Sequence, residues 1–108
     1  MKILNINKTI TPDELLQLLG EKLNPLFREQ RQTEIIFVSE NKDGAIEISA
    51  PGFYEGFLFR IEIKGKELHI TRSEHYVDDV NSLTVESILN EIFADLAEDG
   101  KVTLMREG

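Results

Sequence analysis

The chain has 108 residues, of which 12 are Lys or Arg and 20 are Asp or Glu, and its formal net charge is −8 at pH 7. This balance argues against unaided binding to nucleic acid or to an anionic membrane, because both need clustered basic side chains. The sequence has no Cys, which excludes disulfides and thiolate chemistry and suits a reducing compartment. No stretch resembles a signal peptide or is apolar enough to span a bilayer. We expect one α+β domain over residues 1–108, a cytoplasmic location and no cofactor.

A short strand over residues 2–6 and a helix over about 12–30 are the first expected elements. The helix has a clear start, because Thr11 and Glu14 are spaced as a capping box, in which each side chain bonds the backbone of the other residue. Apolar residues then repeat at helical spacing. Pro25 disfavours helical geometry at the residue before it, so we expect a break there and a short restart of the helix.

An antiparallel meander of four strands is expected over residues 34–72, with one face in the core and one in solvent. Strict alternation in the third strand places Phe57 on the core face and Leu58 on the wet face, where Leu58 hints at a contact surface or a dimer. His69 alternates to the polar face, so we expect a surface residue. The four strands cover residues 34–40, 45–50, 56–64 and 67–72.

A second helix is expected over about 84–99, with Thr84 as its N-cap and Gly100 as its C-terminal cap. Residues 101–105 favour a last short strand. The order is therefore strand, helix, four strands, helix, strand, which predicts a two-layer α+β sandwich with both helices on one face of the sheet. The places of the first and last strands in the sheet stay open.

The charge is concentrated between Ser73 and Gly100. A segment with charge of one sign steers partners of the opposite sign. This one contains no Lys or Arg, and its eight acids account for the whole net charge: Glu74, Asp78, Asp79, Glu86, Glu91, Asp95, Glu98 and Asp99.

Glu91, Asp95 and Glu98 form a ridge near the end of the expected helix, with Asp99 beside them. Acids in the last turns oppose the helix macrodipole, at a cost of ~0.3 to 1 kcal/mol each when exposed. A sequence that breaks a local preference often does so for function, so the ridge is a candidate docking face for a basic protein. The alternatives are a solvated face, or neutralisation inside the fold by Arg60, Lys64, Lys66, Arg72 or Lys101.

Phe53 and Tyr54 lie on a connection bounded by Gly52 and Gly56. Aromatic side chains on such a loop are typical anchors of protein interfaces. The alternative is that the pair folds back over the sheet edge and closes the core.

Four residues in the expected loop before the second helix are weak candidates for metal ligands, because their donor atoms suit calcium, magnesium or manganese. Their spacing fixes no geometry, and a solvated loop is the alternative. We predict no catalytic residue, because the sequence has no nucleophile elbow, phosphate-binding loop or dinucleotide fingerprint. The candidates are Glu74, His75, Asp78 and Asp79.

Three functions are compatible with the sequence. The leading hypothesis is a small non-catalytic module, such as an inhibitor or immunity-type protein, that binds a basic nuclease-like or nucleic-acid-binding protein by imitating nucleic acid. The second is a homodimeric chaperone or adaptor. The third is a divalent-cation-dependent enzyme that uses the loop at residues 74–79.

Overall fold

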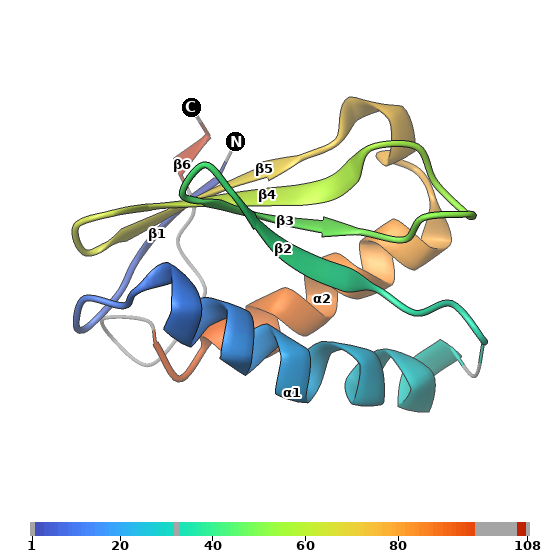
Figure 1. Ribbon diagram of the computed structural model, residues 1–108, viewed down its shortest axis with the longest axis horizontal. Coiled ribbons are helices and arrows are strands. Elements are labelled where there is room, and N and C mark those ends of the chain that lie inside the picture. The colour runs from blue at the N-terminus through green and yellow to red at the C-terminus, as the bar shows by residue number, and fades with distance from the viewer. Residues whose placement is uncertain (1, 32, 97–105, 108) are drawn as a thin grey trace.

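The structure is a computed structural model that describes residues 2–31, 33–96 and 106–107. Within these residues the strands form one antiparallel sheet, and both α-helices cover the same face of it (Figure 1). The predicted two-layer α+β fold is confirmed. The elements in chain order are β1 (Lys2–Asn5), α1 (Pro12–Arg31), β2 (Val38–Lys42), β3 (Ala45–Ser49), β4 (Phe57–Lys64), β5 (Glu67–Arg72), the 3₁₀ turn η1 (Glu74–Tyr76), α2 (Val80–Phe93) and β6 (Arg106–Glu107).

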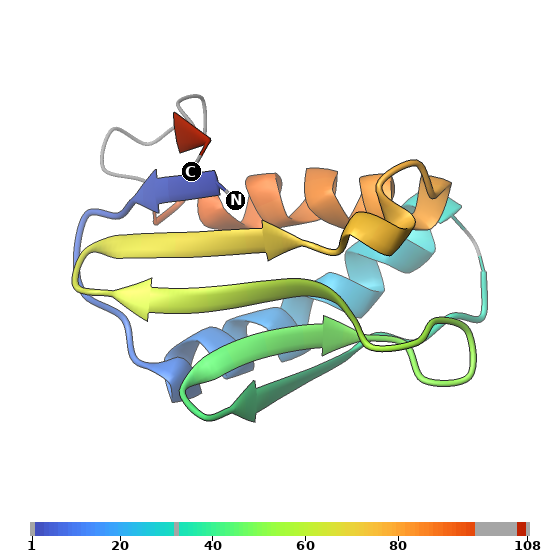
Figure 2. The same cartoon turned by 90° about the horizontal axis from the view of Figure 1, so that it is seen from above.

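The sheet order is β2-β3-β4-β5-β1-β6, which places the first strand beside the end of the meander. The four middle strands of the sequence pair in the predicted meander. Helix α1 carries the chain beneath the sheet from β1 to β2 at the opposite edge, and therefore runs diagonally to the strands (Figure 2). Helix α2 follows β5 and lies beside α1 in the same layer.

The capping box at the start of α1 forms as predicted. The Thr11 N–H donates to Glu14 Oε1 at 3.0 Å, and the Glu14 N–H donates to Thr11 Oγ1 at 3.1 Å. These bonds satisfy two backbone donors that would otherwise lack partners. Two hydrogen bonds with Thr11 lower the pKa of Glu14. The bond from the Thr11 backbone has the larger effect, and the bond with the Thr11 side chain has the smaller one.

Helix α1 runs through Pro25 without a break, so the predicted interruption is wrong. Proline removes the N–H that would bond the Glu21 carbonyl, and this loss weakens the helix locally. Packing outweighs it, because helical stability in proteins comes mainly from a buried face. The residues of that face lie on both sides of the proline: Leu15, Leu19, Leu23 and Phe27.

Asn24 ties the chain after α1 to the helix. Its side-chain amide donates to the Phe37 carbonyl at 2.9 Å, and its Oδ1 accepts from the Phe37 N–H at 2.8 Å. The rings of Phe27 and Phe37 meet edge to face, with centroids 4.6 Å apart. This tether holds Phe37 against the helical layer, and β2 begins at Val38 instead of the predicted residue 34.

The hairpin between β2 and β3 closes through Asp43 and Gly44, whose φ angles are 54° and 91°. Both lie in the left-handed region that a two-residue type I′ turn requires, which explains the Asp-Gly pair. Asn41 Oδ1 accepts from the Gly44 N–H at 2.8 Å and fixes the turn.

Leu58 belongs to the core, so its predicted place on the wet face is wrong. Across β3 and β4, Ile48 pairs with Phe59 and Ser49 pairs with Phe57, which leaves Leu58 as an extra residue. Such a bulge breaks the alternation of side chains. Leu58 is 0% exposed, whereas Phe57 is only half-buried.

His69 is also more buried than predicted, at 9% exposure. It lies opposite Glu62 of β4 and Ile3 of β1. Its Nε2 is 2.9 Å from Glu67 Oε1, and its Nδ1 is buried without a partner in the part of the chain that the structure describes. A histidine between two paired strands is covered by its cross-strand neighbours, which alternation alone does not reveal.

Helix α2 begins four residues before the predicted start, because Asp79 and not Thr84 is its N-cap. The Asp79 carboxylate accepts from the Ser82 N–H at 3.0 Å. Thr84 lies inside the helix and donates its hydroxyl to the Val80 carbonyl at 2.8 Å. The helix ends at Phe93; the predicted cap at Gly100 and the predicted strand at 101–105 lie outside the described residues.

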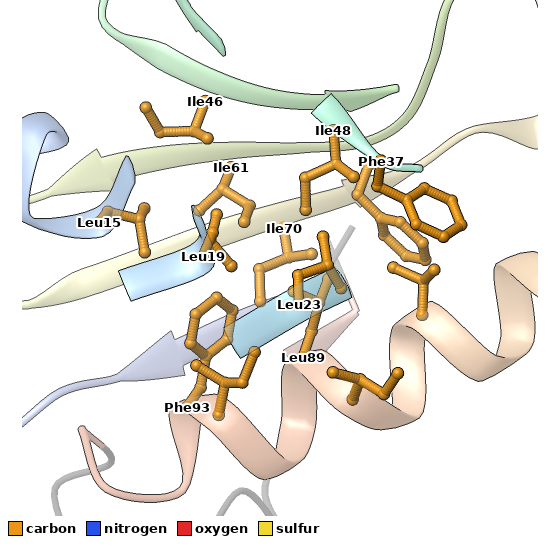
Figure 3. Close-up of a cluster of buried hydrophobic side chains, with 14 of the residues drawn as sticks. Leu15, Leu19, Leu23, Phe37, Ile46, Ile48, Ile61, Ile70, Leu89 and Phe93 are labelled. Atoms are coloured by element: carbon orange, nitrogen blue, oxygen red, sulfur yellow. The ribbon is translucent and has the colours of Figure 1, made fainter. Parts of the chain in front are cut away.

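The core lies between the sheet and the two helices (Figure 3). Close packing there fixes how the helices sit against the sheet, and hence how their outer faces meet. No helix in residues 2–31 or 33–96 is long and apolar enough to cross a membrane. The labelled core side chains are Ile46, Ile48, Ile61 and Ile70 from the sheet, Leu15, Leu19 and Leu23 from α1, Leu89 and Phe93 from α2, and Phe37.

Candidate functional site

One acid of α2 points to the sheet and is neutralised there. Glu86 shares a helix face with the buried Ser82 and Leu89, and its side chain is only 17% exposed. Its carboxylate pairs with Lys2 Nζ at 2.5 Å and with Arg72 Nη1 at 3.0 Å. Glu86 therefore serves the fold, and it uses one of the cations that the sequence offered for neutralisation.

Unlike Glu86, the two members of the predicted ridge that the structure describes are not neutralised by another described residue. Glu91 and Asp95 are exposed, and neither forms a hydrogen bond or an ion pair with another residue that the structure describes. Arg60 pairs with Glu47 at 2.8 Å on the outer face of the sheet. Glu98, Asp99 and the candidate cation Lys101 lie outside the described residues.

The charges at the ends of the two helices differ in how well they match the helix macrodipole. Helix α1 has Asp13 and Glu14 in its first turn and Arg28 and Arg31 in its last turn, as the macrodipole favours. Helix α2 has no basic residue in its last turn. Its C-terminal carbonyls and the nearby carboxylates of Glu91 and Asp95 therefore create a region of negative potential.

This region borders a groove between the helices. The helices meet where Arg31 Nε donates to Asn81 Oδ1 at 3.3 Å, and they diverge toward the other end of the layer (Figure 2). The groove has a volume of about 400 Å³. We call it the acidic groove, and its lining residues are Glu21, Lys22, Pro25 and Leu26 of α1, with Glu91, Ile92 and the adjoining Asp95.

Of the two predicted aromatic anchors, one is exposed to solvent and the other is held by hydrogen bonds. Phe53 is 60% exposed. Tyr54 is half-buried, donates its hydroxyl to Asp79 Oδ2 at 2.8 Å and accepts from Asn81 Nδ2 at 3.1 Å. Burial raises the pKa of Tyr54. Tyr54 therefore joins its loop to the start of α2, and Phe53 alone of the pair is presented to solvent.

Tyr76 fixes the same loop from the other side. Its hydroxyl accepts from the Glu55 N–H at 2.9 Å and donates to the Glu55 carbonyl at 3.1 Å. The rings of Tyr54 and Tyr76 meet edge to face, with centroids 4.9 Å apart. The aromatic connection is thus pinned at two points, which gives Phe53 a defined position.

Several segments that carry exposed apolar residues lie at this end of the molecule. The segments 33–37, 51–56 and 73–79 and the start of α2 lie together there (Figures 1 and 2). An exposed apolar patch often marks an interaction surface. The large apolar residues that these segments expose are Ile36, Phe53, Val77, Val80 and Leu83.

The candidate metal residues do not converge. Asp79 is used as the cap of α2 and as the acceptor for Tyr54, while Glu74, His75 and Asp78 are exposed. No group of three or more His, Cys, Asp or Glu side chains in the described ranges is placed to hold a metal ion.

A second hollow, of about 540 Å³, lies where β4 and β5 meet η1. Phe57, Ser73 and His75 contribute to its lining. The Ser73 hydroxyl accepts from the backbone N–H of His75 at 3.3 Å, so this serine caps η1. A nucleophile needs a base that takes its proton, and the contact shown here involves the histidine backbone and not its ring.

Comparison with family models, with curated proteins and with solved structures found no match.

Sequence reasoning missed the contribution of α1 to the site. No motif singled out Glu21 or Lys22, and Pro25 predicted only a break in the helix, whereas all three residues line the acidic groove. A single sequence shows which face of a helix is polar, but not which polar face lies beside that of a second helix. The signal that could have helped is Pro25 itself, because an uninterrupted helix tolerates an interior proline only where packing supports it.

Proposed function

We propose that this protein is a non-catalytic interaction module that binds a basic segment of another protein in the acidic groove. The observation that carries the proposal is the state of Glu91 and Asp95, which are exposed beside a groove and have no ion pair with another described residue. Glu21 adds a third carboxylate from the opposite wall. A cationic partner would neutralise charges that the described part of the fold leaves unneutralised.

The physical basis is charge complementarity. Carboxylates on both walls create a field that steers a basic surface toward the groove, and such steering raises the association rate at low salt. A nuclease or another nucleic-acid-binding protein fits this description, because its own binding surface is built to receive a row of negative charges. We therefore favour an inhibitor or immunity-type role, in a cytoplasmic setting that suits a chain without Cys.

The test is affinity capture with matched variants. The double variant Glu91→Gln/Asp95→Asn removes two groove carboxylates. The control Asp13→Asn/Glu40→Gln removes two exposed carboxylates outside the groove and changes the net charge equally. Immobilised wild-type and control chains should retain the same basic proteins from a native extract and release them at raised salt, while the groove variant should not. Equal retention by all three chains refutes the proposal.

A second function, a homodimeric chaperone or adaptor, is favoured by a separate observation. A dimer would bury exposed apolar side chains that a monomer leaves in water, among them Ile36, Phe53, Val77, Val80 and Leu83. Light scattering at micromolar concentration tests it. A dimer that Phe53→Ser and Leu83→Ser convert to a monomer supports this function, and a strict monomer removes it.

A further inference from the structure

The acidic groove combines apolar and charged surfaces in a way that suits one kind of side chain. We propose that it is a slot for an arginine side chain that the basic partner inserts as an anchor. This inference rests on the proposed function and names the group that would be recognised.

Three of the residues that line the groove are apolar, and we call them its floor. Ile92 is buried, Leu26 is half-buried and Pro25 is exposed, and all three line the same hollow. Long cationic side chains place their methylene groups along apolar surface while the charged end stays near polar groups. A floor of this kind favours such a side chain over a compact cation, which would gain nothing from the apolar contact.

The rim of the groove is acidic on both sides. Glu21 projects from α1, and Glu91 and Asp95 lie on the α2 side. Glu21 Oε1 accepts from Gln17 Nε2 at 3.2 Å, which leaves its other oxygen available. A guanidinium group has five donors in a plane and binds carboxylates through two bonds at once, so it can use several of these oxygens together.

Pro25 adds a backbone acceptor to the same place. Since proline has no N–H, the Glu21 carbonyl lacks the intrahelical donor that it would have in an ordinary helix. Both residues line the groove. An arginine held by the carboxylates has donors left over, and in the proposed complex the Glu21 carbonyl accepts one of them. This contact would explain why α1 contains an interior proline that weakens it.

Lys22 gives the proposal a further consequence. It lines the groove, and it forms no ion pair with another residue in the described ranges. Its charge opposes that of an incoming cation at short range. The variant Lys22→Gln should therefore bind a cationic probe more tightly than the wild-type chain, by about two- to fivefold.

The test uses short capped peptides as probes and nuclear magnetic resonance as the readout. Acetyl-Ala-Arg-Ala-amide is titrated into the ¹⁵N-labelled full chain, with matched peptides that carry Lys, Gln or norleucine in place of Arg. We expect saturable shifts of the amide signals of Glu21, Leu26 and Ile92 with the Arg peptide. The Lys peptide should bind more weakly, and the Gln and norleucine peptides should not saturate.

Variants distinguish binding in a specific arginine slot from general charge attraction. Glu91→Gln/Asp95→Asn should weaken the Arg peptide by about five- to thirtyfold, since each exposed pair contributes modestly. Pro25→Ala removes the ring and restores the helical N–H, and Leu26→Ala shortens the floor; each should weaken the Arg peptide and reduce its advantage over Lys. Pro25→Ala keeps the test valid if Leu26→Ala destabilises the fold, because alanine favours the helix.

The outcomes are distinguishable. Binding that depends on Glu91 and Asp95 but is unaffected by Pro25→Ala and Leu26→Ala, with Lys equal to Arg, overturns the slot and leaves the proposed function intact. Binding that does not depend on Glu91 and Asp95 overturns both. Shifts spread over the surface without saturation also overturn the slot.

Discussion

Neutralising Glu91 should make the protein more stable, which is an unusual result for removal of a charged side chain. Glu91 lies in the last turn of α2, where its carboxylate opposes the macrodipole at a cost of about 0.3 to 1 kcal/mol. Asp95 lies just beyond the helix end, and its like charge adds at most a few tenths of a kcal/mol. Glutamine has nearly the same helix propensity as glutamate, so Glu91→Gln should raise the free energy of unfolding by roughly 0.5 to 1.5 kcal/mol.

The assay is thermal and urea unfolding followed by circular dichroism at low salt. A gain of this size corresponds to a rise of about 2 to 7 °C in the unfolding midpoint for a chain near this length. The matched control is Asp13→Asn, because Asp13 lies in the first turn of α1 where a negative charge is favourable. That control should lower stability by a similar few tenths to 1 kcal/mol.

Salt gives an internal check on the cause. At about 1 M salt the Debye length is only about 3 Å, so the difference between Glu91→Gln and the wild-type chain should shrink toward zero. If Glu91→Gln destabilises the chain, or if its effect is unchanged by salt, then Glu91 makes a structural contact and the reasoning for a functional carboxylate fails.

Three further predictions concern residues that stabilise the fold around the site. Glu86→Gln should lower the free energy of unfolding by about 1 to 2 kcal/mol in urea denaturation, because two cations lose their partly buried partner; no loss would contradict the assignment of Glu86 to the fold. Asp79→Ala should cost about 1 to 3 kcal/mol by the same measurement, because it removes the cap of α2 and the acceptor of Tyr54, and Asp79→Asn, which keeps a carbonyl oxygen, should cost less. The pKa of Glu14 is lowered in the folded state, so its contribution to stability is complete above the unfolded pKa and is lost as the pH falls through the folded pKa. Thr11→Ala removes the hydroxyl but keeps the backbone N–H, so it should raise the pKa of Glu14 only part of the way toward its ordinary value in a carboxyl carbon titration, and a full return would contradict the backbone bond of the capping box.

The layers and the meander were predictable because local rules agree with the tertiary structure over most of the chain. Alternation located the strands β3, β4 and β5 within a residue or two, and the capping box at Thr11 fixed the start of α1. These signals depend on neighbours within four residues, so a single sequence contains them.

The errors occur where a distant contact overrides a local rule. Asn24 bonds the backbone of Phe37, and this contact delays the start of β2. The bulge in β4 moves Leu58 into the core because β3 pairs around it. Asp79 caps α2 while it also binds Tyr54, 25 residues earlier, and the sequence shows no sign of that partner.

The site was predictable in part. Glu91 and Asp95 were identified from their conflict with the helix dipole, which is a local property. The neutralisation of Glu86 by Lys2 joins residues 84 positions apart, and the groove needs the outer face of α1 beside that of α2. Both depend on how the helices pack, and packing is decided by the whole core.

The most direct test of the account is calorimetric titration of the captured basic partner with three chains: wild type, Glu91→Gln/Asp95→Asn and Asp13→Asn/Glu40→Gln, each at low and at raised salt. The groove variant should bind about five- to thirtyfold more weakly and with a shallower salt dependence. The control should bind like the wild-type chain, because its lost charges lie away from the groove. Equal affinity and equal salt dependence for all three chains would contradict the claim that the acidic groove is the docking site.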